Sequence, residues 1–199
     1  TTTTLNNGTI SVAARATDLA GNVSAVSGSI SVTIDAIAPA VTSAVFQFET
    51  GHALVYAFSE NVSASLQATD LALQNLTTGT TIPSGSQAVV PAPGTYTFPG
   101  VGSGILPDGN YRATLLGAGV TDLAGNALSA NHLHDFFVFA GDANRDRSVD
   151  IGDFSILASR FNLPGTFSQG DFNYTGMTEI GDFSILASKF NTSLSPARG

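Results

Sequence analysis

The sequence has no cysteine, and only seven of its 199 residues are lysine or arginine, against fifteen acidic residues. Disulfide bonds are therefore excluded. The net charge of −8 leaves no basic patch to attract phosphates, so we expect no nucleic-acid partner. No run of eighteen apolar residues occurs, which predicts no membrane span. The first ten residues lack the features of a signal peptide, so we expect any secretion signal to lie upstream of Thr1.

Markers of catalysis are also scarce. The chain has no G-x-S-x-G elbow and no cysteine nucleophile. His132 and His134 form an H-x-H pair, but no third metal ligand of suitable type is evident nearby. Glu49 and Glu60 flank one predicted hairpin, where solvated turn carboxylates are the simpler interpretation. We therefore predict a chain without a catalytic site.

Two segments near the C-terminus are almost the same peptide: residues 151–162 read IGDFSILASRFN and residues 180–191 read IGDFSILASKFN. Acidic and amide residues precede each copy at the spacing of a 12-residue calcium loop, whose positions 1, 3, 5, 7, 9 and 12 supply oxygen ligands. The predicted ligands of loop one are Asp142, Asn144, Asp146, the Ser148 carbonyl, Asp150 and Asp153. Those of loop two are Asp171, Asn173, Thr175, the Met177 carbonyl, Glu179 and Asp182.

The two loops depart from the ideal pattern in different ways. Loop one has Arg147 at position 6, where a positive φ favours glycine, so we expect strain of about 1 kcal/mol there. Loop two has Gly176 at that position but Thr175 in place of a carboxylate at position 5. The sequence therefore predicts two calcium sites, of which the second binds more weakly. The alternative is that these Asp and Asn residues only cap helices and line turns.

The segments before the loops favour one calcium family. Residues 134–140 (HDFFVFA) are typical of a strand, and residues 163–170 (LPGTFSQG) contain proline and glycine, so no helix enters either loop. A duplicated loop followed by a helix, with Asp at position 12, resembles the dockerin module of bacterial extracellular proteins across residues 141–192. The resemblance implies docking on a cohesin-like receptor and membership of a larger protein, such as a polysaccharide-degrading enzyme.

The near-identical helices suggest a receptor face that is present twice. An approximate two-fold axis would exchange the members of each set, so a receptor could bind in either of two orientations. The first set is Ile151, Gly152, Ser155 and Arg160, and the second is Ile180, Gly181, Ser184 and Lys189. The aromatic residues of the helices, at positions 154, 161, 183 and 190, are interpreted as core.

The rest of the chain has an all-β composition, with short alternating runs rich in Thr, Val and Ala. The hexapeptide TDLAGN occurs at residues 17–22 and 121–126, about one sandwich domain apart. This turn resembles one in bacterial immunoglobulin-like domains of secreted and surface-layer proteins. It is interpreted as a turn, with the alternative that Asp18 or Asp122 helps to hold a cation between domains.

These observations predict four segments. Residues 1–37 are the last strands of a truncated immunoglobulin-like domain, or strands that pair with another chain, because they are too few to bury a core. Residues 38–140 form a complete immunoglobulin-like sandwich, residues 141–192 the calcium module and residues 193–199 a tail. The predicted sandwich core is Val41, Val45, Phe48, Val55, Tyr56, Phe58, Leu71, Leu73, Tyr96, Phe98, Tyr111, Leu115 and Phe137.

The expected fold class is thus a mainly β immunoglobulin-like sandwich followed by a small α-helical, duplicated EF-hand-like calcium module. The expected function is a non-catalytic docking and spacer region of a large secreted bacterial protein, located outside the cell or on its surface. The alternative is a structural surface or fibre protein. Its calcium module would then stiffen or cap a row of sandwiches and contact neighbouring surface domains.

Overall fold

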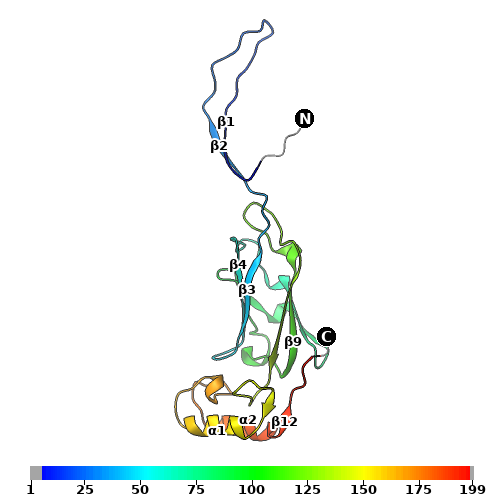
Figure 1. Cartoon of the computed structure of the whole chain (residues 1–199), viewed down its shortest axis with the longest axis vertical. Coiled ribbons are helices and arrows are strands. Elements are labelled where there is room, and N and C mark those ends of the chain that lie inside the picture. Colours follow the sequence, from blue (N-terminus) through cyan, green and yellow to red (C-terminus); the bar gives the residue numbers. More distant parts are fainter. Residues whose placement is uncertain (1–5, 198–199) are drawn as a thin grey trace.

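The structure, a computed structural model, describes residues 6–197. Figure 1 shows three parts in line, which follow one another in the sequence. A long hairpin lies at one end, two β-sheets lie in the middle, and the two helices lie at the other end.

The first part is an antiparallel hairpin of β1 (Gly8–Val12) and β2 (Ile30–Ile34). Its register places Ile10 opposite Val32 and Thr9 opposite Thr33, so one face is apolar and the other is polar. Within residues 6–197 no other element packs on the apolar face, and Ile30 is 64% exposed. The hairpin therefore has no core of its own.

The middle part is a sandwich of two four-stranded antiparallel sheets. One sheet has the order β3 (Val41–Gln47), β4 (Ala53–Phe58), β8 (Thr95–Thr97) and β7 (Ala88–Val90). The other has the order β10 (His132–Val138), β9 (Gly109–Leu115), β5 (Leu71–Asn75) and β6 (Thr80–Ile82). The chain passes from one sheet to the other after β4, β6 and β8.

One hydrophobic core lies between these two sheets. Seven of the predicted core residues are buried there: Tyr56, Leu71, Leu73, Tyr96, Phe98, Tyr111 and Leu115. The prediction for Val45 is wrong, because Phe46 points inward at the next position of β3 and Val45 is left on the solvent face. Phe137 packs instead against the core of the helical part.

The last part contains α1 (Ile151–Arg160) and α2 (Ile180–Lys189), together with the short antiparallel pair β11 (Ser148–Val149) and β12 (Thr192–Ser193). Each helix begins with a reciprocal cap and is followed by an asparagine with φ 61°, Asn162 or Asn191. A second, smaller core joins the helices to the loops before them. Its buried members are Phe139, Ala143, Val149, Leu157, Phe167, Phe172 and Leu186.

The remaining regular elements are short 3₁₀ turns. They are η1 (Ala68–Asp70), η2 (Ser84–Ser86), η3 (Gly102–Gly104), η4 (Gly117–Gly119) and η5 (Phe167–Gln169). Among the residues that the structure describes, no helix is long and apolar enough to cross a membrane.

The expected fold class is wrong. The chain is mostly β, with four sheets, and α1 and α2 are the only α-helices of residues 6–197. A duplicated EF-hand module is not evident: strand β10 leads into the first loop, and the turn η5 leads into the second, so neither loop lies between two helices. The prediction extended the helical character of the repeated peptides to the whole of residues 141–192. The repeated peptides cover little more than α1 and α2 themselves. Residues 141–192 form two loop–helix units.

The hairpin should be much less stable than the sandwich, because an isolated two-stranded sheet is marginal in water. We expect hydrogen exchange of the β1 and β2 amides to be slowed by no more than about 10-fold relative to an unstructured chain. The internal control is the pair β9 and β10, which flanks the second TDLAGN turn and lies over the core. Equal protection of the two pairs would contradict this expectation.

Candidate metal centre

Loop one is wound around the carboxylate of Asp142, which is fully buried. Its Oδ1 accepts a hydrogen bond from the Asp146 N–H at 3.0 Å, and its Oδ2 accepts one from the Arg147 N–H at 2.9 Å. The Asn144 Oδ1 also accepts from the Asp146 N–H, and the Asp146 Oδ1 accepts from the Ser148 N–H. The side chains at positions 1, 3 and 5 are therefore gathered toward the inside of the loop.

Asp150 and Asp153 connect this loop to α1. The Asp150 Oδ1 accepts from the Gly152 N–H at 2.7 Å, and the Asp153 Oδ2 accepts from the Asp150 N–H at 2.9 Å. The Asp153 Oδ1 reaches back to the Asn144 N–H at 3.2 Å. Both residues thus cap the helix, as the alternative interpretation of the sequence has it, and buried Asp153 also holds the loop.

Loop two repeats this arrangement around buried Asp171. Its Oδ1 accepts from the Thr175 N–H at 3.0 Å, and its Oδ2 accepts from the Gly176 N–H at 2.8 Å. The Asn173 Oδ1 accepts from the same Thr175 N–H, and the Thr175 hydroxyl donates to the Met177 carbonyl at 3.4 Å.

The second helix is attached to its loop in the same way as the first. Buried Asp182 accepts from the Phe172 and Asn173 N–H groups through Oδ1, at 2.7 and 2.9 Å. Its Oδ2 accepts from the Glu179 N–H at 2.8 Å, and Glu179 lies at the N-cap of α2. The carboxylates at positions 1 and 12 therefore organise both loops identically.

Positive backbone angles occur at matching places in the two loops. Arg147 has φ 74° and Gly176 has φ 85° at position 6, which confirms the positive φ expected at Arg147. Arg145 and Tyr174, both at position 4, have φ 63° and 60°. The loops tolerate these conformations because buried carboxylates fix the N–H groups on either side.

The buried carboxylates have no cationic partner. Within residues 6–197 the ion pairs are Arg112 with Asp135 and Lys189 with Asp108, and neither involves a loop carboxylate. Burial raises the pKa of Asp142 and of Asp171 above the ordinary value, against the effect of the backbone hydrogen bonds. A buried carboxylate needs opposite charge. Each carboxylate oxygen of Asp142 and Asp171 accepts one of the loop N–H bonds described above and keeps a lone pair for a cation. The residues present therefore fit a hard cation that prefers oxygen ligands.

A separate acidic group lies at the opposite end of the sandwich. Asp35, Glu60 and Asp122 form, within the described residues, the one group of three carboxylates whose oxygens lie within 4.8 Å of one another. Burial and the neighbouring Asp35 and Asp122 raise the pKa of Glu60. Such a cluster alone is no evidence of calcium binding. In the two loops the carboxylates do not converge this closely, because their oxygens are turned toward backbone N–H groups.

The predicted receptor residues do not all lie on one side of the two helices, because Lys189 pairs with Asp108 of the sandwich. Ile151 and Ile180 are 65% and 67% exposed, whereas the Ser155 and Ser184 hydroxyls donate to the carbonyls of those isoleucines within their own helices. Gly152 and Gly181 lie in the first turns, partly buried.

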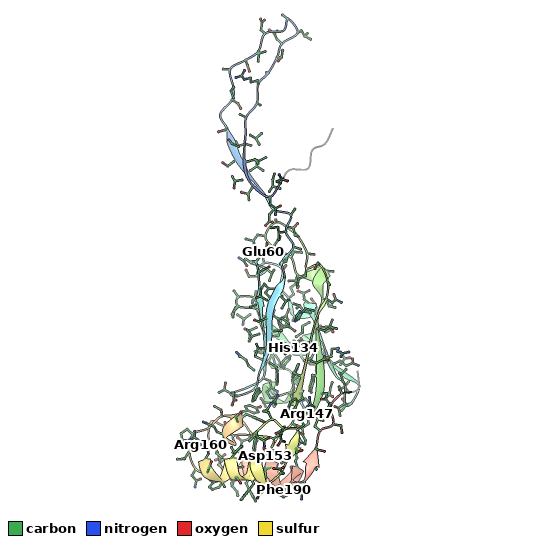
Figure 2. All side chains as sticks on the ribbon, in the orientation of Figure 1. Glu60, His134, Arg147, Asp153, Arg160 and Phe190 are labelled. Atoms are coloured by element: carbon green, nitrogen blue, oxygen red, sulfur yellow. The ribbon has the colours of Figure 1, made fainter. Side chains whose placement is uncertain are left out.

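An apolar groove of about 440 Å³ runs between the helices, lined by Ile151, Phe154, Phe183, Leu186, Ala187 and Phe190. The interpretation of the helix aromatics as core is wrong for Phe161, Phe183 and Phe190, which are about 40% exposed. Figure 2 shows Phe190 on the side of the helices that faces away from the sandwich. Sequence reasoning missed this groove because a helical spacing does not say which apolar face is covered.

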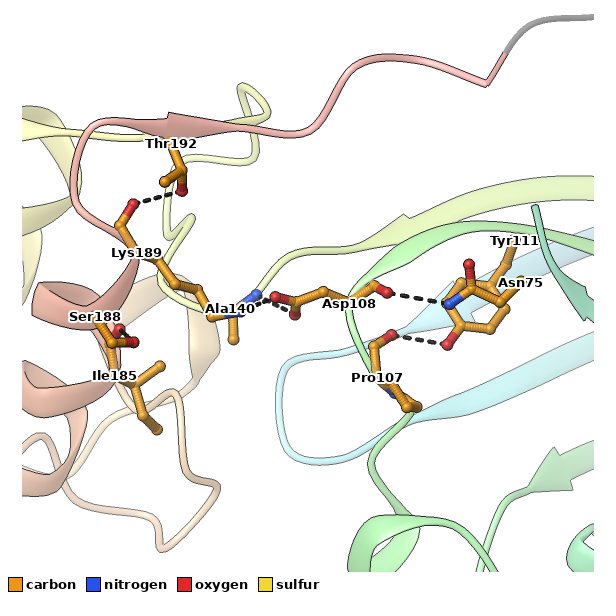
Figure 3. Close-up of polar contacts among 9 residues, drawn as sticks. All are labelled: Asn75, Pro107, Asp108, Tyr111, Ala140, Ile185, Ser188, Lys189 and Thr192. Atoms are coloured by element: carbon orange, nitrogen blue, oxygen red, sulfur yellow. Dashed lines mark hydrogen bonds and ion pairs between the residues drawn. The ribbon is translucent and has the colours of Figure 1, made fainter. Parts of the chain in front are cut away.

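The two copies of the helix differ at their ends. The Lys189 ammonium forms an ion pair with Asp108 of the sandwich (Figure 3). Arg160, its counterpart, lies away from the sandwich (Figure 2), and its buried Nε has no hydrogen-bond partner. Lys189 is therefore tied to the sandwich as Arg160 is not.

Side chains between the ligand positions contact the sandwich, which the sequence did not reveal. The guanidinium of Arg145 lies over the rings of Phe48 and Phe137, and the Tyr174 hydroxyl lies 2.7 Å from His52 Nε2. The other ring nitrogen of His52 accepts from the Leu106 N–H at 2.9 Å. His52 is therefore neutral, with its proton on Nε2. Residues this far apart in sequence offered no local signal.

The chain matches no protein-family model, and no curated protein is similar enough to count as a relative.

The buried histidine gives a testable dependence on pH. Burial, aided by the charge of Arg145, lowers the pKa of His52 from 6.5 to about 4. The unfolded chain therefore takes up a proton first as the pH falls, so the contribution of His52 is complete above pH 6.5 and is lost between pH 6.5 and about 4. The loss should approach about 1.4 kcal/mol per pH unit within this range.

The measurement is the free energy of urea unfolding at pH 7 and pH 5, in calcium-depleted buffer. The His52→Gln variant has no imidazole and serves as the comparison. Its stability should fall less than that of the wild type between the two pH values. Parallel changes in the two proteins would show that His52 does not titrate in this way.

Proposed function

We propose that the chain is a non-catalytic, calcium-binding docking and spacer region of a larger secreted bacterial protein. The observation that carries the proposal is the set of four buried carboxylates, Asp142, Asp153, Asp171 and Asp182, which occupy matching places in two loops and form no ion pair within residues 6–197. Amide, hydroxyl and carbonyl oxygens complete a donor set without nitrogen or sulfur, which suits Ca²⁺. Weak sites of this kind function where calcium is plentiful, outside the cell.

The docking face is the exposed side of α1 and α2. The apolar groove, which Ile151 lines, and the exposed Ile180 at the start of α2 offer area that a protein partner can bury. The resemblance to dockerin modules makes a cohesin-like receptor the proposed partner, and a polysaccharide-degrading enzyme the proposed owner of the region. The sandwich then acts as the spacer.

A structural role is the second candidate. The observation that favours it is the linear arrangement of the three parts, with an uncovered apolar hairpin face at one end (Figure 1). In that case the loop–helix units cap a row of β-domains, and the neighbouring surface domains are the partners. A receptor that binds the helix face would argue against this candidate.

Calcium binding is tested by calorimetry and circular dichroism on the whole chain. Calcium should increase the helical signal, because the loops carry uncompensated buried charge without it. Loop one should bind first, since it has four carboxylates at ligand positions and loop two has three. Asp146→Ala should therefore remove the tighter event and Asp171→Ala the weaker one. The reverse assignment would mean that strain at Arg147 outweighs the charge difference.

Receptor binding is tested with variants of each half of the helix face. The chain is used to capture a secreted partner, and the affinity of that purified partner is then measured. Ile151→Ala with Ser155→Ala should weaken binding by less than about 10-fold, because the second copy remains. The matching changes at Ile180 and Ser184 should do the same, and all four together should abolish binding.

Leu133→Ala, which changes an exposed residue of the sandwich, is the control for these variants. Positions 160 and 189 are left unchanged, because Lys189 also holds the sandwich. Complete loss from one pair of substitutions would show that a single copy of the face is used.

A further inference from the structure

Side chains of both loops and of α2 contact one end of the sandwich, and we call this contact the joint. Its members on the sandwich side are Phe48, Glu49, His52, Asp108, Asn110 and Phe137. On the other side they are Arg145, Arg147, Phe167, Ser168, Tyr174 and Lys189. Figure 2 shows Arg147 at this place, between the sandwich and the helices, whereas Glu60 lies at the far end of the sandwich.

Arg145 is the residue of loop one that reaches deepest into the joint. Its guanidinium carbon lies 4.2 Å from the ring centroid of Phe48 and 3.9 Å from that of Phe137. Its Nη2 donates to the Phe137 carbonyl at 3.1 Å. Arg145 follows Asn144 and precedes Asp146, so two predicted ligands flank a residue that is held by the sandwich.

Arg147 is part of both loop one and the joint. Its backbone N–H donates to the Asp142 carboxylate at 2.9 Å, which shapes the loop. Its guanidinium lies 4.1 Å from the Phe137 ring centroid, and its Nη1 donates to the Asn110 Oδ1 at 2.7 Å. A shift of this backbone would therefore disturb a ligand position and the joint together.

Loop two is held in a corresponding way. Tyr174, between the predicted ligands Asn173 and Thr175, bonds to His52 at 2.7 Å. Just before the loop, the Glu49 carboxylate accepts from the Ser168 hydroxyl at 2.7 Å and from the Ser168 N–H at 3.1 Å.

The end of α2 adds a further attachment. Lys189 pairs with Asp108, whose other carboxylate oxygen accepts from the Ala140 N–H at 2.9 Å (Figure 3). Ala140 lies two residues before Asp142, the first position of loop one. The joint therefore spans both loops and the second helix.

We propose that the joint and the two loops form one linked device, in which an ion in the loops stiffens the joint and the joint strengthens the binding of the ion. This inference rests on the proposed calcium function. Its basis is the alternation of roles along each loop: positions 1, 3 and 5 face the inside, whereas positions 4 and 6 of loop one and position 4 of loop two are fixed on the sandwich. Because binding free energies are reciprocal, each partner must favour the other equally.

The consequence is an orientation that depends on calcium. With ions bound, the helix face is presented at a fixed angle to the sandwich. Without them, the loops loosen and the joint loosens with them, so the docking face is no longer held by the spacer. Ion binding in the loops thereby controls the angle between the helices and the sandwich.

The test uses variants that weaken the joint without touching a predicted ligand. Phe48→Ala and Asn110→Ala act from the sandwich side, and Arg145→Ala acts from the loop side. We expect each to raise the calcium dissociation constant, measured by calorimetry, by about 5- to 150-fold. Val45→Ala, an exposed change in the neighbouring strand β3, is the control and should leave the constant unchanged.

The sign of the Arg145→Ala effect separates linkage from simple electrostatics. Removing a positive charge beside an acidic loop would, by charge alone, tighten calcium binding. The joint predicts the opposite, because the loop loses an anchor that holds it in the binding conformation. Tighter or unchanged binding in this variant would overturn the inference.

Hydrogen exchange of the wild-type chain provides the reciprocal measurement. Calcium should slow exchange of amides at the sandwich end of the joint, around Asn110 and Phe137, and leave those around Leu66 and Val120 unaffected. Should the wild type bind no calcium, the proposed function and this inference both fall. Should it bind calcium with unchanged exchange at the joint and unchanged affinity in all three variants, only the linkage is refuted.

Discussion

The fold of the last third of the chain depends on the burial of carboxylates that form no ion pair within the part of the chain that the structure describes. Such groups cannot lie free in a low-dielectric interior, so the backbone folds around them and supplies N–H donors. Asp142 and Asp171 each accept from two N–H groups of their own loops, and Asp153 and Asp182 tie the helix starts back to the same loops. The helices are positioned by these bonds as much as by their apolar contacts.

The conformation of loop one also determines the positions of the Arg145 and Arg147 side chains. Arg145 and Arg147 are the nearest positive charges to Asp142, yet neither forms an ion pair with it. Their guanidinium groups lie against Phe137, and each donates to an uncharged oxygen of the sandwich. The cation–π contacts and these hydrogen bonds together stabilise both guanidinium groups at the sandwich. The loop consequently keeps its negative charge, which is the property that an incoming cation requires.

The sequence predicted the parts of this architecture that have local signals. Alternating runs predicted the sandwich strands and seven of the seventeen buried residues of its core. The Asp and Asn spacing predicted both loops and the positive φ at Arg147. Patterns within a strand could not decide between Val45 and Phe46, because neighbouring apolar residues leave the inward position open. The joint escaped prediction because it connects residues such as His52 and Tyr174, which no periodicity relates. The predicted fold class was wrong because two similar helical peptides were taken to indicate a whole helical module.

The duplicated peptide shows how little a repeat fixes beyond local structure. Both copies form helices of the same length with a reciprocal cap, although the N-cap residues, Asp150 and Glu179, differ and lie just before the repeated peptides. Their surroundings differ: Phe183 is exposed where Phe154 is half-buried, and Lys189 is paired with the sandwich where Arg160 is not. A receptor that bound either copy would contact similar side chains in different structural surroundings. The sandwich therefore breaks the two-fold symmetry of the repeat, because it forms an ion pair with Lys189 of the second helix and none with Arg160 of the first.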